Sequence, residues 1–291
     1  MMSGKKIGVA LLTLAAVTAL GCSGEVVPGD EATEDGTTGT TSQAITLLGG
    51  AFWGQFGNSG PDAYLGPDND RTCYLVGIHG QLKGTLNGSY NGKPAGAYVY
   101  RNNGGWYLAT RQGGGIGVNA EAHCIPGASN RVTVRSSSFY NPNPPALLIP
   151  KGPNRQCFIT GVYSYRGFQD VGDWTGLRPP GNTSGADPNN WQFVTKVKPA
   201  YDSFGNAFAG GQVDVTCVDV PIPNYGGVER NGTSGAFSSE AGLACGLTFL
   251  AGSFFANPPL GGNDGVGVSL SGGVWSAHAT SGKQMRTTCV K

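Results

Sequence analysis

The sequence predicts an all-β fold made of three antiparallel β repeats, each held by its own disulfide, arranged in a row or around a pseudo-threefold axis. Three observations support this prediction. Of the 291 residues, 50 are Gly and 18 are Pro, which leaves little room for helices. Only 13% of the residues are charged while 39% are hydrophobic, which is enough for a folded core. Six of the seven cysteines form three pairs along the chain, and in each pair a tryptophan follows the first cysteine at a similar distance.

The first segment, residues 1–21, has the features of a secretory signal peptide. Lys5 and Lys6 precede an apolar stretch from Ile7 to Leu20. This stretch is too short to span a membrane but has the length of the central region of an export signal. We therefore expect an exported protein.

The end of this stretch carries a more specific pattern, Ala19-Leu20-Gly21-Cys22 followed by Ser23. These residues resemble the cleavage site of bacterial lipoprotein precursors, which are cut before a cysteine that then carries lipid. Ala19 departs from the family, which most often has Leu there. The resemblance covers only the first 22 residues. It implies a lipid on Cys22 and, because Ser23 is not the Asp of the inner-membrane retention signal, a lipoprotein on the periplasmic or cell-surface face of an outer membrane.

The alternative is an ordinary signal peptide in which Cys22 is incidental. The cysteine count favours lipidation, because seven cysteines would leave one reactive thiol in an oxidising compartment. Residues 22–45 follow as a disordered tether, since residues 23–45 are rich in Thr, Gly and Ser and hold five acidic residues and no basic one.

Three repeats make up the rest of the chain, at residues 46–127, 128–221 and 222–291. In each repeat a first cysteine opens an apolar run, a tryptophan follows 30 to 34 residues later, and a second cysteine closes the repeat. The tryptophans are Trp106, Trp191 and Trp275. We interpret them as structural residues that pack near each disulfide, and we expect neighbouring repeats to share little core.

Residues that favour turns come shortly before each of the repeated tryptophans, which predicts a β-hairpin there. Asn102–Gly105 separates two apolar runs in the first repeat, and Ser271–Gly273 does so in the third. Gly and Asn reach positive φ at low cost, so both segments predict tight hairpin turns. In the second repeat Pro188-Asn189-Asn190 directly precedes Trp191. Each tryptophan is therefore expected to start the strand that leaves a turn.

The closing strands alternate with a period of two, and each closing cysteine lies on the apolar side. In the first repeat Ala120, Ala122 and Cys124 share one face, while Glu121 and His123 share the other. Six cysteines allow 15 pairings, and the sequence alone does not decide among them. The repetition favours pairing within each repeat, that is Cys73–Cys124, Cys157–Cys217 and Cys245–Cys289.

Residues suited to catalysis or metal binding are scarce. We interpret His123 as a surface residue and His79 as a packing residue at a strand end, whereas His278 has no evident partner. The turns Gly66–Asp70 and Asn263–Gly265 carry oxygen ligands suited to Ca²⁺, but Asp and Asn also fill turns for purely local reasons, and we favour that interpretation. We expect no enzyme activity, no cofactor and no metal.

The aromatic residues offer a better functional indication. Trp53 and Trp174 do not repeat, and Trp174 lies with Arg178 in a segment rich in Gly, Pro, Asn and Asp that we predict to be a loop. Trp53, Trp174 and Arg178 are therefore the candidate ligand-binding residues. The alternative is that both tryptophans merely close the ends of the core.

These features predict a noncatalytic cell-envelope lipoprotein whose repeats present loops to an extracellular partner, a polysaccharide or a surface protein. The alternatives are a purely structural envelope or matrix protein and, less favoured, a hydrolase with an unfamiliar site. The net charge of +1 and the lack of a Lys/Arg cluster argue against nucleic acid.

Overall fold

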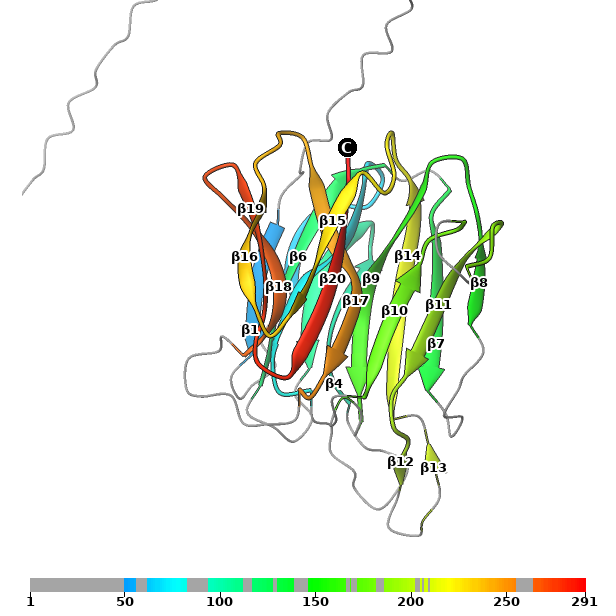
Figure 1. Ribbon diagram of the computed structural model, residues 1–291, viewed down its shortest axis with the longest axis vertical. Coiled ribbons are helices and arrows are strands. Elements are labelled where there is room, and N and C mark those ends of the chain that lie inside the picture. The colour runs from blue at the N-terminus through cyan, green and yellow to red at the C-terminus, as the bar shows by residue number, and fades with distance from the viewer. Residues whose placement is uncertain are drawn as a thin grey trace, which may run out of the picture. The chain divides into compact units, whose positions relative to one another are not determined.

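The computed structural model describes most of the predicted repeats, namely residues 50–55, 62–82, 94–111, 117–127, 130–138, 146–165, 168, 172–181, 186–201, 205, 207–208, 210–254 and 264–291. These residues form 20 strands and no helix, so the predicted all-β class is confirmed. No helix in this part of the chain is long and apolar enough to cross a membrane. The strands build three six-stranded antiparallel sheets, which we name sheets A, B and C, and one two-stranded sheet (Figure 1).

Each large sheet combines strands from distant parts of the chain. In spatial order, sheet A contains β1 (Gly50–Gln55), β6 (Val118–Pro126), β3 (Arg71–Gly80), β18 (Gly265–Ser271), β19 (Val274–Ala279) and β16 (Ser234–Ser238). In the same way, sheet B contains β2 (Ala63–Pro67), β5 (Gly105–Arg111), β4 (Ala95–Asn102), β9 (Arg155–Ser164), β14 (Gly211–Asp219) and β7 (Val132–Ser138). Sheet C contains β15 (Gly226–Asn231), β20 (Lys283–Val290), β17 (Ala244–Gly252), β10 (Trp174–Arg178), β11 (Asn190–Lys196) and β8 (Leu147–Pro150). The small sheet pairs β12 (Ala200–Tyr201) with β13 (Ala207–Phe208).

The three large sheets follow one plan in which the repeats exchange hairpins. In each sheet the two cysteine-bearing strands of one repeat pair with each other, and the hairpin of a different repeat adds to the opening strand. The first repeat gives its hairpin β4–β5 to β9 of the second, the second gives β10–β11 to β17 of the third, and the third gives β18–β19 to β3 of the first. The threefold repeat of the sequence is therefore a closed cycle of strand exchange.

The three disulfides are those expected, Cys73–Cys124, Cys157–Cys217 and Cys245–Cys289. Each joins directly opposed residues on the opening and closing strands of one repeat. Three disulfides are typical of proteins exported from the reducing cytoplasm.

The opening strands β3, β9 and β17 come from three different sheets and contact one another pairwise at the centre. The residue after the opening cysteine lies at this meeting point. Tyr74 and Phe158 stack there with ring centroids 4.2 Å apart. The third position is Gly246, where an added Cβ would lie 2.6 Å from atoms of both rings.

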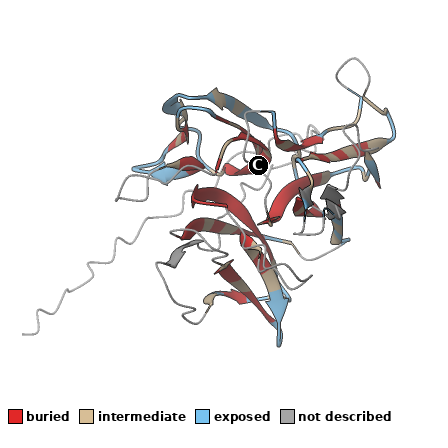
Figure 2. Ribbon diagram, turned by 90° about the horizontal axis from the view of Figure 1, so that it is seen from below, coloured by how far each residue is buried: buried red, intermediate tan, exposed pale blue. Residues whose placement is uncertain are grey.

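One hydrophobic core therefore serves all three repeats, and its residues are red in Figure 2. Our expectation that the repeats share little core is wrong. The exchanged hairpins are the physical reason, because each one carries its buried side chains into the sheet of another repeat.

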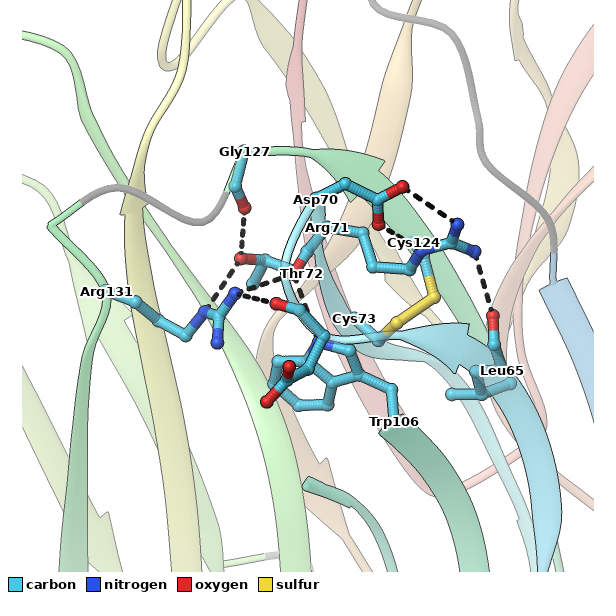
Figure 3. Close-up of a disulfide and its surroundings, with 10 residues drawn as sticks. Leu65, Asp70, Arg71, Thr72, Cys73, Trp106, Cys124, Gly127 and Arg131 are labelled. Atoms are coloured by element: carbon cyan, nitrogen blue, oxygen red, sulfur yellow. Dashed lines mark hydrogen bonds and ion pairs between the residues drawn. A yellow bond between two sulfur atoms is a disulfide. The ribbon is translucent and has the colours of Figure 1, made fainter. Parts of the chain in front are cut away.

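The repeated tryptophans are buried and lie second in their strands β5, β11 and β19, as predicted. Trp106 also ties its hairpin back to its own repeat. Its indole Nε1 donates to the carbonyl of Arg71, two residues before Cys73, at 3.1 Å (Figure 3). The guanidinium of Arg131 covers its ring at 5.1 Å from the centroid.

Candidate functional site

The structure places the candidate binding residues on two different sheets. Trp53 belongs to the edge strand β1 of sheet A, where its backbone lies opposite Ala120. Trp174 and Arg178 are the first and last residues of β10 in sheet C. Trp53 and Trp174 therefore lie in different sheets. Residues 1–49, which include the signal peptide, Cys22 and the tether, lie outside the described residues.

The expectation that Trp174 lies on a loop is wrong. Residues 174–178 form a strand because β11 on one side and β17 on the other satisfy their backbone hydrogen bonds. Apart from Gly176, which lies within it, the Gly and Pro residues that suggested a loop flank this short strand.

A pocket of about 500 Å³ lies at the outer face of sheet C, and Trp174 and Arg178 both line it. Phe249 of the neighbouring strand β17 forms its aromatic centre. The rings of Trp174 and Phe249 stack with centroids 6.1 Å apart and planes inclined by 27°. The pocket thus presents aromatic surface to solvent, beside the polar side chain of Gln192.

A glycine leaves room for the Phe249 ring on this face of the sheet. Gly176 faces Phe249 across the two strands, and a Cβ at this position would lie 2.6 Å from Phe249 Cδ2. Any larger residue at position 176 would displace the ring and reduce the exposed aromatic face.

Two arginines supply the hydrogen-bond donors of the pocket. Arg286 lies over Phe249 at 5.5 Å from the ring centroid and donates through Nη2 to the carbonyl of Leu177 at 2.9 Å. Burial lowers the pKa of Arg286; the charge of Glu229 opposes this shift and the charge of Arg178 adds to it. The guanidinium remains charged at neutral pH, because the ordinary pKa of arginine lies far above neutrality. The described lining residues are otherwise apolar or polar and uncharged, and Glu229 lies opposite Arg286 on the neighbouring strand β15.

Phe249 and Arg286 are absent from the sequence-based candidates, although an internal comparison of the repeats holds a signal for one of them. Four residues after the opening cysteine, the first two repeats have Gly77 and Gly161, and the third has Phe249. An aromatic residue that replaces a repeated glycine on a strand is as unusual as a tryptophan that does not repeat. At the position of Arg286 the other two repeats have Glu121 and Asp214, so Arg286 departs from the repeat only in the sign of its charge.

The histidines lie in sheet A and pack against rings. His79 stacks on His278 with ring centroids 5.0 Å apart, which gives His278 the partner that the sequence did not reveal. Burial, with a smaller effect of His278, lowers the pKa of His79 to about 4. His123 is half-buried rather than a surface residue, and burial also lowers its pKa to about 4. Neutral, packed imidazoles fit the interpretation of His79 as a packing residue.

The two acidic turns have cationic partners on the protein itself. Asp70 pairs with Arg71 at 2.8 Å, and Asp264 accepts from Lys283 at 2.6 Å. Within the described ranges, no three His, Cys, Asp or Glu side chains are grouped so that they could hold a metal ion.

Neither a protein-family model nor a curated protein matches this chain. The pocket geometry therefore carries the functional argument.

Proposed function

We propose that the protein is a noncatalytic lipoprotein of the outer membrane that binds extracellular polysaccharide through the pocket of Trp174, Phe249, Arg178 and Arg286. The observation that carries this proposal is the stacked aromatic pair flanked by two guanidinium groups on a solvent-facing sheet.

This combination suits sugars for a chemical reason. The apolar faces of sugar rings stack on aromatic rings, and their ring and hydroxyl oxygens accept hydrogen bonds from N–H donors. Arg286 is held by its bond to Leu177, so little side-chain freedom is lost when a ligand binds.

The test is binding of the full-length protein to a glycan array, followed by titration of each oligosaccharide that binds. Trp174→Ala and Phe249→Ala should each weaken binding by about tenfold, since each removes one stacking surface. Leu270→Ser changes an exposed residue of sheet A, 42% accessible, and should leave binding unchanged. Absence of binding to every glycan contradicts the proposal and favours a purely structural envelope protein.

Thermal melts separate binding from folding. Trp191 is 2% exposed, so Trp191→Ala should destabilise the fold by about 3–5 kcal/mol. Trp174 is only half-buried, and Trp174→Ala should lower the melting temperature much less. If both variants were equally damaging, Trp174 would be a core residue and the proposed site would lose its main support.

The membrane anchor is the second part of the proposal, and it rests on the pattern Leu20-Gly21-Cys22 and on the odd cysteine count. The six other cysteines are all in disulfides, so Cys22 is the one left for lipid. Cys22→Ser should move the protein from the membrane fraction to the soluble fraction of cells. A wild-type mature chain that begins at Ser23 or beyond would exclude the anchor.

A further inference from the structure

Sheet B carries a continuous row of tyrosines on its outer face. The row crosses four neighbouring strands, β9, β4, β5 and β2. Successive ring centroids along it are 4.9, 5.6, 5.6 and 5.3 Å apart. This tyrosine row consists, in spatial order, of Tyr163, Tyr98, Tyr100, Tyr107 and Tyr64.

The other two sheets show that the fold does not need these tyrosines. The residue after the repeated tryptophan is Tyr107 in the first hairpin, but Gln192 in the second and Ser276 in the third. The strand registers extend this comparison to the whole row. The equivalent residues are Ala251, Gly176, Arg178, Gln192 and Leu148 in sheet C, and His79, Gly267, Ser269, Ser276 and Ala236 in sheet A.

Ion pairs fix the middle of the row. Arg111 donates to both oxygens of Asp62 at 2.8 and 3.1 Å and lies over the Tyr98 ring, 5.3 Å from its centroid. The Tyr100 hydroxyl donates to the same carboxylate at 2.6 Å. These contacts hold two neighbouring rings in place before any ligand binds.

A matching ion pair lies at the β9 end. Arg135 donates to both oxygens of Asp214 at 2.6 and 2.7 Å and lies 5.3 Å from the centroid of the Tyr163 ring. Each arginine beside the row is thus neutralised by a carboxylate. At the other end Tyr64 is 59% exposed. Among the described residues, the row is thus aromatic, and the two arginines that contact its rings are both paired with carboxylates.

We propose that the tyrosine row is a second binding surface, separate from the pocket on sheet C, for an extended neutral polysaccharide. Five rings with successive centroids 4.9 to 5.6 Å apart offer stacking to several successive sugars, whereas a pocket offers it to one. The paired arginines retain N–H donors for hydroxyl groups but have no free charge to attract a carboxylate, sulfate or phosphate chain. A nucleic acid strand also stacks on aromatic rings but requires a cationic groove, which these ion pairs do not provide.

The experiment titrates the full-length protein with cellohexaose, laminarihexaose, mannohexaose and xylohexaose, with the matching disaccharides and with an alginate hexamer as the anionic comparison. At least one neutral hexasaccharide should bind, and more tightly than its disaccharide. Tyr64→Ala combined with Tyr107→Ala should weaken that binding tenfold or more, since two rings are removed. Tyr201→Ala changes an exposed tyrosine of the small sheet and is the matched control with unchanged binding.

Four outcomes would overturn the proposal. They are no binding of any neutral hexasaccharide, unchanged binding in the double variant, stronger binding of the alginate hexamer than of every neutral chain, and self-association of the wild type that the double variant abolishes. Trp174→Ala should not alter binding to the row, and the double variant should not alter binding to the pocket. Failure of either site is therefore distinguishable from failure of the other.

Discussion

Gly246 shows how one residue adapts a threefold repeat to a centre with limited space. The residues equivalent to it in the other repeats, Tyr74 and Phe158, are fully buried and stack on each other. A third side chain at this point would overlap both rings. The repeat is therefore symmetric in its backbone and asymmetric in its central side chains.

Gly246→Val should destabilise the protein by about 1–3 kcal/mol, because overpacking forces the two rings out of their stacked position. Equilibrium unfolding in denaturant measures this. The matched control is Gly226→Ala on strand β15, where an added Cβ meets nothing within 4 Å. Equal stability of Gly246→Val and the wild type would mean that the centre is loosely packed.

His123 makes stability depend on pH. Burial lowers its pKa from 6.5 to about 4, so below pH 6.5 the unfolded chain takes up a proton that the folded protein excludes. Protonation of His123 therefore leaves the free energy of unfolding unchanged above pH 6.5 and lowers it progressively as the pH falls towards 4. His79 acts in the same direction, whereas Glu121, whose pKa burial raises, acts in the opposite one.

Between pH 6.5 and pH 4, the unfolding free energy of His123→Gln should fall by about 1–3 kcal/mol less than that of the wild type. Denaturant titrations at a series of pH values give this slope for the variant and the wild type. Parallel curves would show that His123 is solvated rather than buried.

At the scale of elements, the hairpins depend on turns that require positive φ. Gly272 and Gly273 have φ of 57° and 78°, and the corresponding turn of the first repeat has Asn103 and Gly104 at 46° and 74°. Asn tolerates this conformation better than other residues with a side chain. The first hairpin thus supplies an internal reference for the third.

Gly272→Val should cost about 1–2 kcal/mol of unfolding free energy, since a β-branched residue is strained at positive φ. Gly272→Asn should cost much less, as Asn103 shows. Thermal unfolding of the two variants compares them directly. No other contact complicates the comparison, because an added Cβ at Gly272 has nothing within 4 Å.

The same elements show what sequence patterns predict and what they miss. The turns, the strands that leave them and the inward register of Cys124 follow from local periodicity, and the structure confirms them. The partner of each hairpin does not follow, because alternation specifies a buried face but not which strand lies beside it. For this reason the tyrosine row, whose members come from two repeats, becomes apparent only when the sheets are assembled, and so does the placement of Phe249 beside Trp174.

At the scale of the whole molecule, the shared core makes the three repeats one cooperative unit. Each sheet contains strands of more than one repeat, and a single cluster of buried residues joins all three. A perturbation in one repeat is therefore not confined to it.

Replacing Cys245 and Cys289 together with Ala should destabilise the protein by about 4 kcal/mol, as the chain-entropy model gives for a loop of this length. Hydrogen exchange should quicken in strands of all three sheets. The corresponding variant without Cys157 and Cys217 should also speed hydrogen exchange in strands of all three sheets. Faster exchange limited to β17 and β20 would show that the repeats unfold independently.

The cyclic exchange of hairpins also limits the order in which the sheets can be completed. A chain that becomes available from its N-terminus can complete only sheet B before the third repeat follows, because the strands of that sheet end at Asp219. Sheet A, which holds the first disulfide, needs β18 and β19 from the end of the chain. Until those strands arrive, β3 presents an open edge that other chains could pair with. An incomplete chain therefore needs protection at its first repeat for longest, and the sheet with the tyrosine row is the first that can be finished.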